Sequence, residues 1–145
     1  QMCIRDRANG SQKVSELLED IEKRITIRTK ERKNQHEATV IIYQMTELMT
    51  ELDSVDQGRL AFVLEKGLRA GYASIAMTSP NIIRSIDVAS KIARGFKQSL
   101  VAMRISEQTV FSSLNNRPIR EGNLDLQTHY YILDNTVHKI KVLMK

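Results

Sequence analysis

Two histidines of this chain each follow an aspartate by four residues, in the pairs Asp125 with His129 and Asp134 with His138. Carboxylate and imidazole groups at such spacing could ligate a transition metal. The two pairs are nine residues apart, which at about 100° per helical residue places them on opposite faces of a helix. They cannot share an ion there, so we expect ordinary helix-surface pairs and no metal site.

Local motifs that carry catalysis are absent from the sequence. It contains no phosphate-binding GxxxxGK[ST] loop, no GxSxG nucleophile elbow and no HExxH. Serine and threonine are common, but none stands in a motif with a base at a predictable distance. Adjacent carboxylates such as Glu19 and Asp20 have the pattern of a solvated face. We therefore expect no enzyme, no catalytic residue, no cofactor and no small-molecule substrate.

The strongest local charge signal is the stretch EKRITIRTKERKNQH, in which Glu31 is the only acidic residue between Lys23 and Lys33. Such clusters can neutralise nucleic-acid phosphates without reading sequence. No aromatic residue is interleaved with them, so a stacking platform for single strands is not evident. A solvated helical surface is the favoured interpretation, and nucleic-acid binding is the alternative. The residues concerned are Lys23, Arg24, Arg28, Lys30, Arg32 and Lys33.

The first seven residues, QMCIRDR, resemble the transposon end of a common sequencing adapter translated in frame. One set of codons for them is CAG ATG TGT ATA AGA GAC AGR. We treat residues 1–7 as an adapter artefact on a metagenomic fragment and exclude them from the fold. Lys+Arg then falls from 22 to 20 and Asp+Glu from 17 to 16, so the net charge falls from +5 to +4. The remaining chain has no cysteine, which excludes disulfides and thiolate sites.

The sequence contains no membrane span. No apolar run approaches the roughly 18 residues that a spanning helix needs, and the longest notable cluster is residues 40–43. No signal peptide is visible either. Together with the missing cysteines, this pattern indicates a cytoplasmic protein.

Three turn signals divide the chain into four predicted helices. Pro80 and Pro118 lie in the turn-like contexts SPN and NNRPIREGN. Ser54 followed by Gln57 has the form of a capping box and predicts a helix start. The predicted helices span residues 11–52, 55–78, 81–115 and 125–144.

Apolar residues in the last two segments recur at spacings of three and four. The third segment shows this from Ile82 to Leu114 and the fourth from Leu126 to Met144. Such spacing is typical of the seam between helices packed at shallow angles. It predicts an all-α fold, an elongated up-and-down bundle of about four helices that forms a single domain over residues 8–145.

Gly67 and Gly71 lie one helical turn apart in GLRAGYASIAM, within the second predicted helix. Each glycine inside a helix costs about 1 kcal/mol relative to alanine. The spacing favours a close helix crossing inside the monomer, which small side chains allow.

The first predicted helix has coiled-coil character and is about 42 residues long, whereas the second predicted helix is about 24 residues long. Because the two helices differ in length, the beginning of the first would extend beyond the bundle as an overhang. An apolar seam of Val14, Leu17 and Ile21 would then need cover from a second copy or another protein. A break near residues 33–36 is the competing possibility and would need no partner. The sequence thus predicts a noncatalytic interaction or assembly scaffold that acts through coiled-coil surfaces. A small basic nucleic-acid-binding accessory factor is the alternative function.

Overall fold

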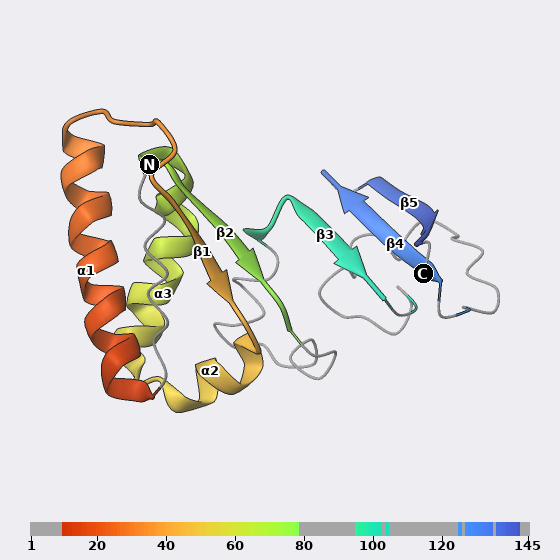
Figure 1. Ribbon diagram of the computed structural model, residues 1–145, viewed down its shortest axis with the longest axis horizontal. Coiled ribbons are helices and arrows are strands. Elements are labelled where there is room, and N and C mark those ends of the chain that lie inside the picture. The colour runs from red at the N-terminus through yellow and green to blue at the C-terminus, as the bar shows by residue number, and fades with distance from the viewer. Residues whose placement is uncertain are drawn as a thin grey trace. The chain divides into compact units, whose positions relative to one another are not determined.

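The computed structural model of the protein describes residues 10–78, 95–102, 104, 125, 127–134 and 136–142. Backbone contacts divide the chain into two compact units, Gln1–Ser79 and Pro80–Lys145, and each unit is described by itself (Figure 1). The adapter interpretation of residues 1–7 lies outside the described residues.

The prediction of an all-α bundle is wrong. The described residues form two sheets together with helices, and strands occur in both units. In the first unit the order is α1 (Ser11–Lys30), β1 (Ala38–Ile42), α2 (Met45–Glu51), α3 (Ser54–Lys66), the 3-10 helix η1 (Gly67–Ala70) and β2 (Tyr72–Ala76).

Strands β1 and β2 form a two-stranded parallel sheet. The register pairs Ala38 with Tyr72 at one end and Ile42 with Ala76 at the other. Parallel strands cannot be joined by a tight hairpin, and here α2, α3 and η1 provide the crossover. The first unit therefore contains a β-α-β arrangement.

Helices α1 and α3 pack against each other beside this sheet (Figure 1). From α1, Leu18 and Ile25 are buried, and from α3, Leu60 and Val63 are buried. Tyr72 at the start of β2 is also buried, with only 3% of its surface exposed. The core of the first unit thus lies between the two helices and one face of the sheet, and α2 adds Met45 and Met49 to it.

The helix predicted over residues 11–52 is interrupted after Lys30. Arg32 takes a left-handed backbone conformation with φ 54°, and β1 follows within a few residues. The β-branched run of Thr39 to Ile42 suits a strand better than a helix. The long coiled-coil helix and its overhang are therefore wrong, and the break proposed near residues 33–36 is confirmed in position. Within the described part of the chain, no helix is both long and apolar enough to cross a membrane.

The helix predicted over residues 55–78 ends much earlier. It begins at Ser54, one residue before the predicted start, but α3 stops at Lys66 and η1 and β2 follow. Gly71 has φ 90°, a conformation that glycine adopts without strain and other residues rarely take. Gly67 is thus the first residue of η1 and Gly71 follows its last, and the two do not form a helix-crossing motif. Gly67 does allow close packing, because a Cβ built on it would lie 3.2 Å from the Cβ of Tyr72.

The second unit contains an antiparallel sheet in the order β3 (Gln98–Val101), β4 (Thr128–Leu133) and β5 (Thr136–Lys141). Burial alternates along β4, where Thr128, Tyr130 and Ile132 are buried. Val101 of β3 pairs with Tyr130 and is buried too. This period of two is the pattern of a sheet with one buried face.

The helix predicted over residues 125–144 is wrong, because its described residues form β4 and β5. The aromatic and β-branched residues of THYYIL favour a strand, and they satisfy a helical spacing only in part. The helix predicted over residues 81–115 lies mostly outside the described residues. The part that is described includes β3, which is a strand.

Candidate functional site

The carboxyl ends of β1 and β2 meet at one edge of the parallel sheet. Tyr43 and Gln44 follow β1, and Met77 and Thr78 follow β2, and all four are exposed. In open α/β sheets, ligands bind at the carboxyl ends of the strands, where loops leave the sheet. These four residues therefore form the candidate site, which we call the strand-end site.

Backbone hydrogen bonds fix the strand-end site beyond the sheet itself. The amide of Met77 donates to the carbonyl of Ile42 at 2.9 Å, and the amide of Met45 donates to the carbonyl of Met77 at 2.9 Å. Between them, Gln44 adopts a left-handed conformation, φ 55° and ψ 58°, which is uncommon for a residue with a side chain. This turn sends the chain from β1 directly into α2.

The chemistry of the strand-end site is polar but uncharged. It offers a phenol, an amide, a thioether and a hydroxyl, and the Thr78 hydroxyl lies 3.0 Å from the Thr46 hydroxyl on α2. The nearest carboxylate along the chain after β1 is Glu47, in the first turn of α2. Among the described residues, no group of three or more histidine, cysteine, aspartate or glutamate side chains could hold a metal ion. The site can therefore form neutral hydrogen bonds but offers no cluster of acidic ligands.

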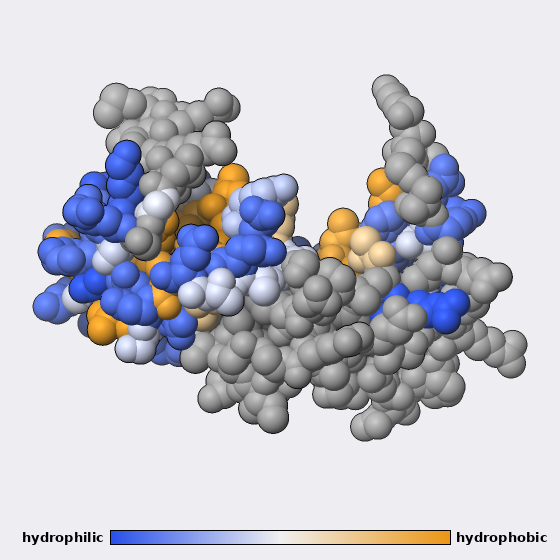
Figure 2. Space-filling model, turned by 90° about the horizontal axis from the view of Figure 1, so that it is seen from below, coloured by the Kyte–Doolittle hydropathy of each residue, from blue (hydrophilic) through white to orange (hydrophobic). Residues whose placement is uncertain are grey.

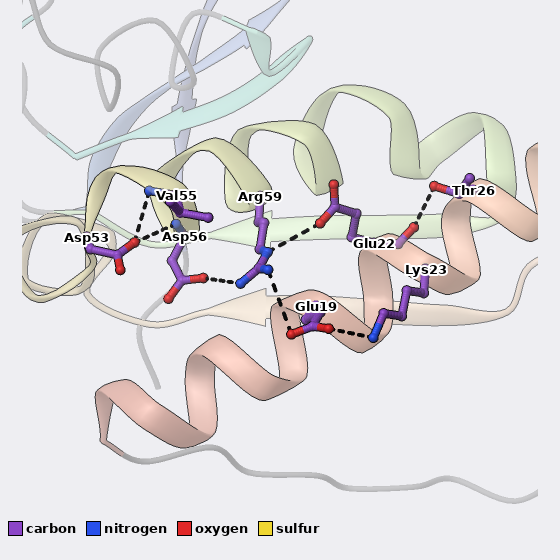
Figure 3. Close-up of polar contacts among 8 residues, drawn as sticks. All are labelled: Glu19, Glu22, Lys23, Thr26, Asp53, Val55, Asp56 and Arg59. Atoms are coloured by element: carbon purple, nitrogen blue, oxygen red, sulfur yellow. Dashed lines mark hydrogen bonds and ion pairs between the residues drawn. The ribbon is translucent and has the colours of Figure 1, made fainter.

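A separate charged cluster ties α1 to α3 (Figure 3). Arg59 of α3 contacts Asp56 at 2.9 Å on its own helix, and it reaches Glu22 at 3.4 Å and Glu19 at 3.7 Å on α1. Asp56 is buried, so its charge needs this partner. Lys23 lies 2.5 Å from Glu19 on the outer side of the cluster. The cluster therefore links two helices, α1 and α3.

Hydrogen bonding sets the proton affinities within this cluster. The hydrogen bond from Lys23, then the charges of Lys23 and Arg59, lower the pKa of Glu19. The hydrogen bond to Asp56 raises the pKa of Arg59. Both shifts favour the charged forms, which is the behaviour of a structural ion-pair network and not of a general acid or base.

The fold is similar to solved structures of EssC. The chain matches EssC (ATPases 2 and 3) from Geobacillus thermodenitrificans with a TM-score of 0.72 and 17% identity, covering 97% of this chain and 28% of that one. It matches the cytoplasmic domain of EssC with a TM-score of 0.66 and 17% identity, covering 94% of this chain and 29% of that one. This chain thus spans less than a third of the length of either structure, and at this identity the likeness establishes the fold alone. Comparison with protein-family models gave no match, and neither did comparison with curated proteins.

This likeness overturns the function predicted from the sequence. The structures matched are α/β ATPase domains, and the described residues form two sheets, so a scaffold acting through coiled-coil surfaces is wrong. The alternative, a small basic nucleic-acid-binding factor, gains no support from these comparisons either.

The six basic residues named for that alternative do not form one surface. Arg28 points inward, and its guanidinium bonds the carbonyls of Ala70 and Gln35 and the carboxylate of Glu37. Three others lie close to a carboxylate on their own segment. These pairs are Lys23 with Glu19 at 2.5 Å, Arg24 with Asp20 at 2.8 Å and Lys33 with Glu31 at 2.8 Å. Lys30 and Arg32 are exposed at the end of α1 and in the turn after it.

The residues named for partner binding lie on α1. Val14, Leu17 and Ile21 are half-buried in the chain itself. Because α1 packs against α3, these three residues do not project beyond a bundle as the overhang prediction required.

The two aspartate–histidine pairs do not lie on a helix, as the sequence predicted. His129 lies on β4 and His138 on β5, and the register puts both on the same face of the sheet. The carboxylate of Asp125 accepts a hydrogen bond from Thr128 at 2.5 Å instead of pairing with His129. The predicted opposite-face arrangement of a helix is therefore wrong.

Sequence reasoning missed the strand-end site. Two short apolar runs in the sequence precede the site. The β-branched run TVII stands directly before Tyr43 and Gln44, and the run ASIA stands directly before Met77 and Thr78. A short apolar run of this kind cannot be distinguished from a buried helical segment by periodicity alone. The charged cluster around Arg59 was missed as well, because its partners come from two separate helices.

Proposed function

We propose that this chain is a noncatalytic part of an ATPase-like α/β module within a larger protein. Three observations support the proposal: the parallel β1–β2 pair with its helical crossover, the likeness of fold to two EssC ATPase structures, and the uncharged strand-end site.

The strand-end site carries the argument against hydrolysis. In P-loop ATPases the magnesium ion is held by a loop hydroxyl and an acidic residue, and backbone amides of a glycine-rich loop hold the phosphates. Carboxylates are preferred protein ligands of magnesium. Here Tyr43 and Gln44 follow β1, and the 145 residues contain no GxxxxGK[ST] loop. None of the four strand-end residues is a carboxylate, so the site as described offers neither the acidic ligand nor the glycine-rich loop of such an ATPase.

The larger protein would supply the remainder of the module. The matched EssC chains are more than three times as long as the part that this chain covers. We place the protein in the cytoplasm, because one matched structure is named a cytoplasmic domain and because residues 8–145 contain no cysteine. Its partners are then other protein segments, and neither a cofactor nor a small substrate is required.

Phosphate release from ATP in the presence of magnesium tests the proposal. The 145-residue chain should release no more phosphate than buffer alone, whereas enzymes typically turn over at about 1 to 1000 per second. The matched variants Gln44→Ala and Thr78→Ala serve as controls for contaminating activity. Turnover by the wild type that either substitution abolishes would overturn the noncatalytic assignment.

A further inference from the structure

We draw no further inference here: the strongest candidate, the apolar face of the β1–β2 sheet on which Ile41 and Ile75 are register partners, supports no proposal because nothing in the structure shows what covers it, although Figure 2 shows apolar residues at the surface of the first unit.

Discussion

The guanidinium of Arg28 donates a hydrogen bond from Nε to the main-chain oxygen of Ala70 at 2.7 Å, across 42 positions of the sequence. The same side chain donates to the carbonyl of Gln35 at 2.7 Å and pairs with Glu37 at 2.6 Å. One residue thus joins the last turn of α1, the turn before β1 and the end of η1. This junction sets where β1 and β2 begin.

Replacing Arg28 by alanine should destabilise the first unit. A hydrogen bond to a charged group contributes about 1.5–3 kcal/mol, and the loss here leaves the carbonyl of Ala70 without this donor. Arg24→Ala is the matched control, because Arg24 forms an exposed pair with Asp20 that contributes about 0.5 kcal/mol or less. Urea unfolding followed by circular dichroism measures both variants. Equal losses for the two would contradict the role assigned to Arg28.

Gly71 should tolerate no side chain. Its φ of 90° is unfavourable for other residues, and a Cβ built there would lie 2.0 Å from the carbonyl oxygen of Gln35. Gly71→Ala should cost more than about 3 kcal/mol of unfolding free energy, since both strain and overlap contribute. Gly58→Ala in α3 meets nothing within 4 Å and should instead stabilise the helix by up to about 1 kcal/mol. A thermal melt showing similar midpoints for the two variants would refute the geometry at Gly71.

The pKa of Asp125 should depend on Thr128. The hydrogen bond from the Thr128 hydroxyl lowers that pKa in the folded chain. A lowered folded pKa contributes stability that is present above the unfolded value of about 3.9 and is lost as the pH falls through the folded value. Thr128→Val should raise the pKa of Asp125 toward its ordinary value, as measured by carboxyl-carbon NMR titration. An unchanged titration curve would show that the hydroxyl does not hold the carboxylate.

Part of the fold could be predicted from the sequence. The start of α3 is confirmed to within one residue, but the capping box of Ser54 and Gln57 is wrong. Asp53 caps the helix instead and accepts from the amides of Val55 and Asp56. The turn signal at this point was therefore informative, because it depends on residues close together in the chain.

The sheets could not be predicted in the same way. The strand β1 is short and apolar, and its pairing with β2 depends on contacts more than thirty residues apart, which no local period reveals. In β4, Tyr130 and Leu133 fit a helical spacing by coincidence, while the aromatic and β-branched composition favoured a strand. The strand-end site was missed for the same reason, since it exists only once β1 and β2 lie parallel.

The most direct test of the account is a titration of the isotope-labelled 145-residue chain with magnesium ATP, followed by the amide resonances of Tyr43, Gln44 and Thr78. These residues lie where a nucleotide would bind in an open parallel sheet. No saturable change is expected at the three amides, because the strand-end residues include no carboxylate and the sequence contains no GxxxxGK[ST] loop. A saturable change confined to them, lost when magnesium is removed, would contradict it.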